Sequence, residues 1–222
     1  MQPYVDSIKS LFEKNANPAQ AGPMKKYMRE QFEYLGIKSP RFKELMKELI
    51  ATHGKPPIKN LDVILRELWS LPQREFQYAA NSLLGRSEKD LPANFIETIE
   101  YMITTKSWWD TVDTISGGPL GVHFRRFPDV RDKYLARWRA SENFWLRRAA
   151  ILFQLNYKNE TDFDLLCEII RENLGSKEFF INKAIGWSLR QYARVDPKAV
   201  KMFVKSTPLH PLSRREAMKH LE

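Results

Sequence analysis

The chain has 222 residues, of which 43% are hydrophobic and 28% charged, with a formal net charge of +9 at pH 7. This composition is typical of a soluble globular protein with a sizeable core, and no apolar run approaches the roughly 18 residues of a transmembrane helix. Cys167 is the single cysteine, so a disulfide framework within the chain is excluded. We expect no signal peptide at residues 1–6 and a reducing, cytoplasmic environment. The positive balance favours a polyanionic partner or an anionic surface, although it would also serve solubility alone.

Apolar residues recur at helical spacing almost throughout, and no alternating strand pattern or hairpin signal competes. In chain order, helices are expected near residues 5–12, 24–35, 39–52, 61–68, 74–84 and 95–103, then around 105–113, and after N-caps at Ser141, Ser176 and Asp196. Gly117, Gly118 and Pro119 are expected to break the chain after the helix that contains the tryptophan pair.

Two positions recur along these helices at shifts of 35 residues. The first is aromatic, at Trp109, Phe144 and Phe179, and the second is polar or charged, at Tyr78, Asp113, Arg148 and Lys183. Helix pairs that repeat at about this length are typical of HEAT-type α-solenoids. We therefore predict an all-α fold, an α-solenoid of HEAT-like antiparallel helix pairs with a concave basic groove, as a single domain over residues 1–222. A plain helical bundle is the alternative.

The charged position could bind a polyphosphate backbone. Arg148 and Lys183 occupy it, and Arg190 lies two turns beyond Lys183 on a similar face. Cations spaced along one surface bind phosphates and release counterions. The alternative is an ordinary solvated face with scattered ion pairs.

The tryptophans fall into two groups. Trp69, Trp138 and Trp145 stand in apolar contexts and are expected in the core. Trp109 and Trp187 are instead in phase with, or one turn from, charged residues, which indicates a ligand surface.

Asp113 is one turn from Trp109 and in phase with the cations. A carboxylate weakens anion binding, so its presence is better explained if positive charge develops there, as at the oxocarbenium-like sugar of glycoside hydrolysis. It could also orient or deprotonate the attacking water. The alternatives are a structural ion pair with Lys106 or Arg148, or simple solvation. The four histidines have no metal-ligand spacing with the cysteine, no nucleotide-binding motif occurs, and we expect neither a metal nor a cofactor.

Residues 105–113, 145–155 and 176–187, extended by 27–37, 66–69 and 211–217, resemble the AlkD-like DNA glycosylases, the HEAT-like repeat DNA alkylation repair enzymes. The resemblance implies hydrolysis of the N-glycosidic bond of positively charged N3- or N7-alkylated purines in duplex DNA, without base flipping. It implies that Trp109 and Trp187 contact the deoxyribose of the lesion. It also implies that Asp113 stabilises the developing oxocarbenium ion and positions water.

The same resemblance implies that Arg148 holds the phosphate backbone, and that Tyr27, Phe179 and Phe180 line the duplex. Lys38 stands where the better-known family pattern has glutamine, and a contact there would become a charged phosphate contact. The expected partner is double-stranded DNA with alkylated bases, bound by a monomer with no membrane contact and associated with the bacterial nucleoid. A non-catalytic helical-repeat module for nucleic acid or an acidic protein is the alternative, and a protein scaffold is a third reading.

Overall fold

The computed structural model describes residues 3–221, which are predominantly α-helical. Among these residues no β-strand forms, and Glu33 and Gln73 make an isolated bridge. None of the helices in this part of the chain is long and apolar enough to cross a membrane. The prediction of an all-α fold is confirmed.

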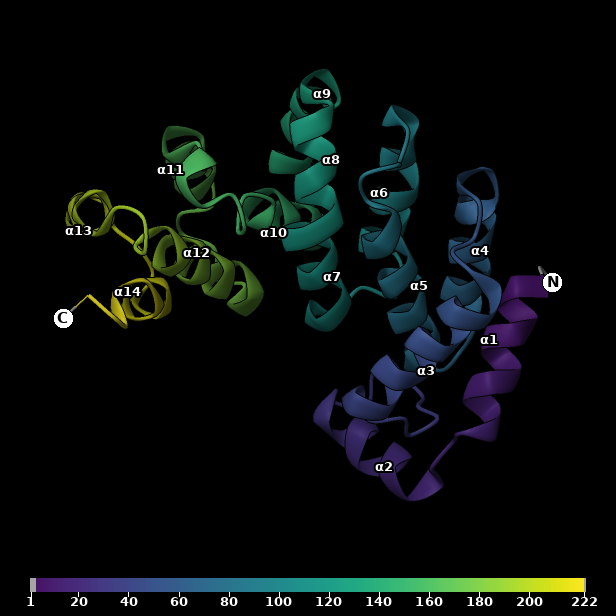
Figure 1. Cartoon of the computed structure of the whole chain (residues 1–222). Helices are drawn as coiled ribbons and strands as arrows, with labels where there is room; N and C mark the ends of the chain where they lie inside the picture. Colours follow the sequence, from purple (N-terminus) through teal and green to yellow (C-terminus); the bar gives the residue numbers. More distant parts are fainter. Residues whose placement is uncertain (1–2, 222) are drawn as a thin grey trace. The chain divides into compact units, whose positions relative to one another are not determined.

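The contacts divide the chain into two compact units, one ending at Thr98 and the other beginning at Ile99, and the organisation as a single domain stays a prediction. The first unit contains α1 (Pro3–Lys14), α2 (Pro18–Tyr27), α3 (Ser39–His53), α4 (Ile58–Ser70), α5 (Arg74–Ser87) and η1 (Ala93–Phe95) (Figure 1). The division falls within α6 (Ile96–Thr104). The second unit contains α7 (Trp109–Ile115), η2 (Ser116–Leu120), α8 (Gly121–Arg126), α9 (Pro128–Arg139), α10 (Phe144–Leu152), η3 (Lys158–Glu160), α11 (Phe163–Glu172), α12 (Phe179–Tyr192), α13 (Pro197–Ser206) and α14 (Pro211–Met218).

The 35-residue period is seen in the spacing of the first residues of five helices. The starts of α3, α5, α7, α10 and α12 are Ser39, Arg74, Trp109, Phe144 and Phe179, each 35 residues after the one before. The period therefore reaches α3, one repeat earlier than the sequence comparison found. Residues that are 35 positions apart therefore occupy the same place in their helices, counted from the first helical residue.

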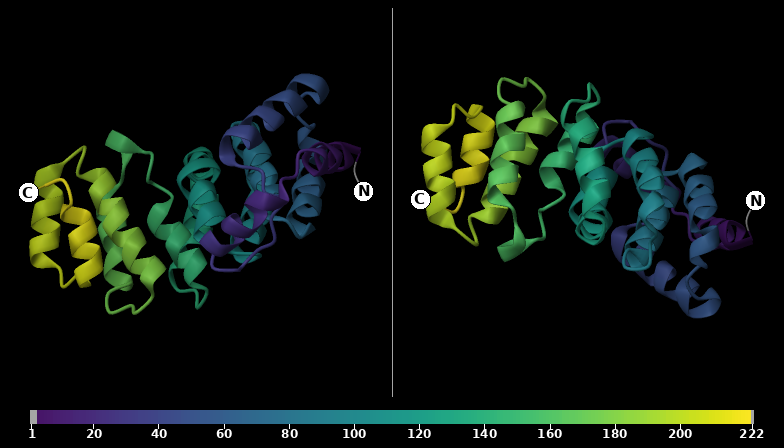
Figure 2. Two further views of the ribbon diagram at one scale, coloured as in Figure 1. Left: turned by 90° about the horizontal axis from the view of Figure 1, so that it is seen from below. Right: turned by 90° about the horizontal axis from the view of Figure 1, so that it is seen from above.

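Within the second unit, α10 packs between α7 and α12, and α12 packs against both α13 and α14. Figure 2 shows α12, α13 and α14 side by side at the C-terminal end of the chain. Stacking of successive helices in chain order is the arrangement of an α-solenoid. Trp138 and Trp145 are buried in this unit, and Trp69 is buried in the first, as predicted.

The predicted helix over 24–35 is wrong. α2 ends at Tyr27, and the chain then runs irregularly to Lys38, with positive φ angles at Arg29 and Glu30. Glu75, a buried carboxylate at the start of α5, holds the end of this irregular segment. Its oxygens accept the backbone N–H groups of residues 35, 36 and 37 at 2.9–3.0 Å, so these donors are satisfied outside any helix.

The predicted break at residues 117–119 is confirmed as a kink at Gly118, whose backbone angles are not helical. The segment is a π-helical turn, η2, that leads directly from α7 into α8, with the irregular backbone confined to Gly118 (φ −111°, ψ −106°). Single π turns inside helical stretches are a known way to accommodate an extra residue. The chain therefore leaves the helical path at Gly118, and a kink separates α7 from α8.

One of the three predicted N-caps is confirmed. Asp196 accepts a backbone N–H of the first turn of α13. Ser141 and Ser176 each stand two residues before the observed N-caps, Asn143 and Glu178, and their hydroxyls accept the N–H groups of those residues. Both serines therefore order the chain entering the helix.

Candidate active site

A pocket of about 240 Å³ opens in the second unit beside α7, α10 and most of the length of α12, and against α14. Its lining comprises Trp109, Asp113, Arg148, Phe179, Phe180, Lys183, Trp187, Arg190 and Glu216. All of these except Glu216 were predicted as site residues. The structure thus brings the three predicted catalytic residues and five of the predicted DNA-binding residues into one place.

The helix period explains this convergence. Asp113 and Arg148 are both the fifth residues of their helices, and α7 and α10 are in contact. On α12, Lys183, Trp187 and Arg190 follow spacings of four and three residues, which aligns them on one face. Charged and aromatic side chains from α7, α10 and α12 therefore line one continuous surface.

Asp113 and Arg148 form a two-pronged ion pair. Arg148 Nε donates to Asp113 Oδ1 at 2.7 Å, and Nη2 donates to Oδ2 at 2.8 Å. Arg148 Nη1 donates to the backbone carbonyl of Phe180. The arginine side chain is only 4% exposed and the aspartate side chain 16%, so dissolved salt screens their attraction only weakly. Arg148 was one of the two partners considered for Asp113 from the sequence, and it fixes the orientation of the carboxylate.

Two opposing effects act on the ionisation of Asp113. Burial raises the pKa of its carboxyl above the ordinary value of 3.8, and the hydrogen bonds and charge of Arg148 oppose that rise. A carboxylate has about four lone-pair positions, of which Arg148 uses two. The remaining positions are available to a ligand in the pocket.

Glu216 is the residue that the sequence analysis missed. Its Oε1 lies 3.0 Å from Lys183 Nζ, and its Oε2 accepts from Arg190 Nη1 at 2.5 Å. These hydrogen bonds hold the pKa of the Glu216 carboxyl below its ordinary value of 4.5. Lys183 and Arg190, predicted as phosphate contacts, are thus ion-paired in this structure, and their DNA contact stays a prediction.

The aromatic side of the pocket is built on a ring cluster. Phe180 packs against Trp108 and Trp145 at centroid distances of 5.2 and 4.9 Å. Phe179, one residue earlier, is 57% exposed. One phenylalanine therefore anchors the start of α12, and the other offers an apolar surface to a ligand.

Tyr27 and Lys38, the remaining predicted DNA contacts, belong to the first unit. Tyr27 ends α2 with 74% of its side chain exposed, and Lys38 is an exposed residue directly before α3. Neither lines the pocket of the second unit. Their roles stay predictions.

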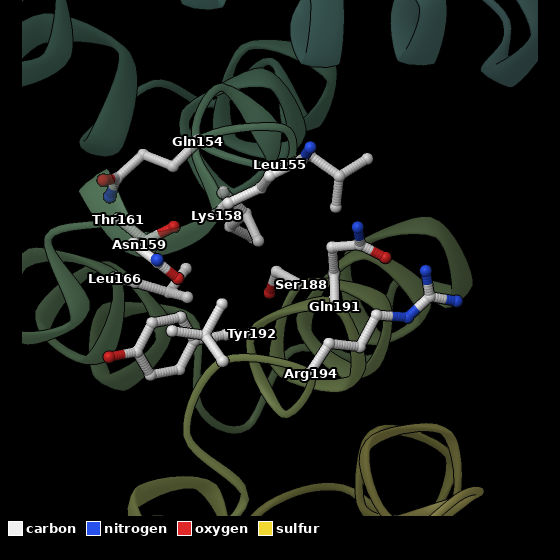
Figure 3. A pocket seen from close by; sticks show the side chains of 12 residues that line it. Gln154, Leu155, Lys158, Asn159, Thr161, Leu166, Ser188, Gln191, Tyr192 and Arg194 are labelled. Atoms are coloured by element: carbon white, nitrogen blue, oxygen red, sulfur yellow. The ribbon is translucent and has the colours of Figure 1, made fainter.

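A second cavity of about 240 Å³ lies between the ends of α10 and α12 and the start of α11 (Figure 3). Its rim carries Lys158, Ser188, Gln191 and Arg194, and its lining contains no carboxylate, histidine or cysteine. Hydrolytic chemistry generally needs a group that manages protons or stabilises developing charge. The pocket around Asp113 is therefore the stronger candidate. In residues 3–221 no group of three potential metal ligands from His, Cys, Asp and Glu gathers.

The stacked helices define an α-solenoid protein, and the pocket of tryptophans, a carboxylate and cations is its candidate site. The chain belongs to the DNA alkylation repair enzyme family, whose model matches residues 8–221. This membership confirms the family resemblance and implies DNA as the substrate.

Two solved structures are similar to the chain. A predicted DNA alkylation repair enzyme from Enterococcus faecalis has 33% sequence identity and a TM-score of 0.86, with 93% of this chain and 96% of that chain covered. The protein smu.31 from Streptococcus mutans UA159 has 16% identity and a TM-score of 0.62, with 90% and 100% covered, and it shares the fold. No curated protein sequence matches the chain.

Proposed function

We propose that this protein is a DNA glycosylase that hydrolyses the N-glycosidic bond of positively charged N3- or N7-alkylated purines in duplex DNA. The observation that carries the proposal is the Asp113 carboxylate, held by Arg148 in a pocket that Trp109 and Trp187 also line. A fixed negative charge stabilises positive charge that develops at the sugar, and it costs no reorganisation during the reaction. The tryptophan faces would contact the deoxyribose, and the free lone pairs of Asp113 would orient the water.

The second carboxylate of the pocket supports a cationic substrate. Hydrolysis of an ordinary glycoside needs a protonated acid for the leaving group. The lowered pKa of Glu216 keeps that carboxyl ionised near neutral pH, so it cannot serve as this acid. An alkylated purine already carries a positive charge and leaves without protonation, which fits the groups present.

The family resemblance implies recognition without base flipping. We propose that the pocket contacts the sugar and backbone of a lesion that stays in the duplex, with Arg148, Lys183, Arg190, Tyr27, Phe179, Phe180 and Lys38 as candidate DNA contacts.

Release of 7-methylguanine from a methylated duplex tests the proposal. The wild-type protein is expected to release the free base faster than the enzyme-free duplex does, as measured by chromatography of the soluble fraction. Its affinity for the duplex should fall steeply with salt, with each neutralised phosphate adding about 0.9 to the slope of log K against log salt. Salt-sensitive binding without release of the base would contradict the proposed glycosylase activity and favour a non-catalytic binding module. Affinity that is indifferent to salt would favour a protein scaffold.

Excision should also depend on pH through Asp113. Because burial raises the pKa of this carboxyl above 3.8, its ionised fraction falls at a higher pH than that of an ordinary aspartate. The single-turnover rate is therefore expected to be flat near neutral pH and to fall tenfold per pH unit below the raised pKa. Spontaneous release at each pH is subtracted as the control. A rate that stays flat down to pH 3.8 would contradict the role of ionised Asp113.

A further inference from the structure

Glu216 reaches the pocket from α14, a helix that contributes no other lining residue. Its side chain is 15% exposed, and it bonds to two cations of α12, Lys183 at 3.0 Å and Arg190 at 2.5 Å. Arg190 Nη1 also donates to the Glu216 backbone carbonyl at 3.3 Å. The carboxylate is therefore held on both sides and joins α14 to the ligand-facing side of α12.

The packing of α14 on α12 is built for this contact. A Cβ at Gly186 would lie 2.4 Å from Glu216 Cβ and 2.8 Å from the Ser213 carbonyl oxygen, so only glycine allows the two helices to approach this closely. The Ser213 hydroxyl also donates to the Asn182 backbone carbonyl at 2.9 Å. Glycine and serine thus fix where the Glu216 carboxylate lies.

The charges of the pocket show what this carboxylate contributes. Asp113 and Arg148 balance each other through two hydrogen bonds. Lys183 and Arg190 carry two further positive charges, and Glu216 supplies one negative charge against them. Without Glu216 both cations would face the pocket unopposed. They would attract any DNA phosphate and repel a positively charged lesion.

We propose that Glu216 is a positioning and selectivity residue. It holds Lys183 and Arg190 beside Trp187 and offsets their charge, so that the pocket favours a cationic alkylated nucleotide over undamaged DNA. The proposal rests on the glycosylase function proposed above and goes beyond it by assigning discrimination to a residue outside the catalytic set. Specificity of this kind is a difference between two affinities, and it depends on the unfavourable contact as much as on the favourable one.

Glu216→Gln tests the proposal, because it keeps the shape of the side chain and removes the charge. Two duplexes are compared by fluorescence anisotropy: one undamaged, and one carrying 7-methylguanine on a 2′-fluorinated sugar, which slows glycosidic cleavage. The variant is expected to bind the undamaged duplex about threefold more tightly, and to lose about three- to tenfold of the preference for the cationic lesion. Its single-turnover excision rate on an unfluorinated lesion should fall by a similar factor. Opposite movements of affinity and rate would not arise from a structural defect, which weakens both.

Two further variants complete the experiment. Glu216→Asp retains the charge and is expected to restore most of the preference. Glu172→Gln removes the same charge from a carboxylate that pairs with Arg139 at 2.5 Å and does not line the pocket, and it should leave the preference unchanged. An unchanged preference in Glu216→Gln, or an equal loss in Glu172→Gln, would overturn the proposal. Absence of release by the wild type would instead overturn the proposed function, while the affinity comparison would still decide the role of Glu216.

Discussion

Asp113→Asn is expected to slow the release of 7-methylguanine on the order of 10²- to 10³-fold, the scale of removing one preorganised electrostatic group. Asparagine keeps the size of the side chain and one acceptor oxygen. It removes the negative charge that stabilises the developing oxocarbenium ion in the proposed mechanism. The measurement is single-turnover excision with enzyme in excess, so that the rate reports the chemical step rather than product release.

Affinity for the same duplex should be retained in this variant, because a carboxylate does not attract phosphate. Loss of rate with retained affinity places the contribution of Asp113 in the transition state. Asp110→Asn is the matched control, since Asp110 lies on α7 but does not line the pocket. An Asp113→Asn variant that excises as fast as the wild type would exclude the carboxylate mechanism. An equal loss in both variants would point to damage to α7.

The 35-residue period explains why residues singled out in the sequence lie together in one pocket. Repeats that stack must bury equivalent positions in equivalent surroundings, so a 35-residue shift relates residues that lie next to each other in space. Asp113 and Arg148 are such a pair, 35 residues apart and doubly hydrogen-bonded. Their relation is visible in the sequence before any coordinate is known.

Glu216 could not be found in this way, because α14 does not follow the period. It begins at Pro211, 32 residues after the start of α12 at Phe179, so no repeat position points to it. Its place depends on how closely two helices pack, and that depends on a glycine of the other helix. Gly186 permits the close approach, but a glycine alone does not indicate which helix approaches.

The prediction of a helix over residues 24–35 failed for a different reason. Apolar residues between 24 and 35 follow a helical spacing, and local pattern alone favours a helix there. The carboxylate of Glu75 accepts the N–H groups of residues 35, 36 and 37, some 40 residues earlier, and so favours an irregular backbone at the end of this segment. A buried acidic side chain that replaces helical hydrogen bonds leaves no local trace in the segment it binds.

The pair of Asp113 and Arg148 should behave as a unit in stability. Arg148→Gln leaves a carboxylate that is 16% exposed without its counterion, and Asp113→Asn leaves a guanidinium that is 4% exposed without its own. Each single substitution is expected to lower the free energy of unfolding by about 3–5 kcal/mol. The double variant removes both charges and restores a neutral amide pair, so it should lose less than the sum of the two by about 1–3 kcal/mol.

Urea unfolding of the four proteins at pH 7, followed by circular dichroism, measures this coupling. Additive losses would show that the pair contributes no mutual stabilisation. They would also mean that Arg148 does not fix the carboxylate by direct pairing. The same measurements show whether Asp113→Asn is folded in the absence of urea. Excision by that variant is interpretable only if it is folded. The pair therefore links the two experiments, because the carboxylate charge that the proposed reaction needs is also the charge that Arg148 is expected to neutralise in the fold.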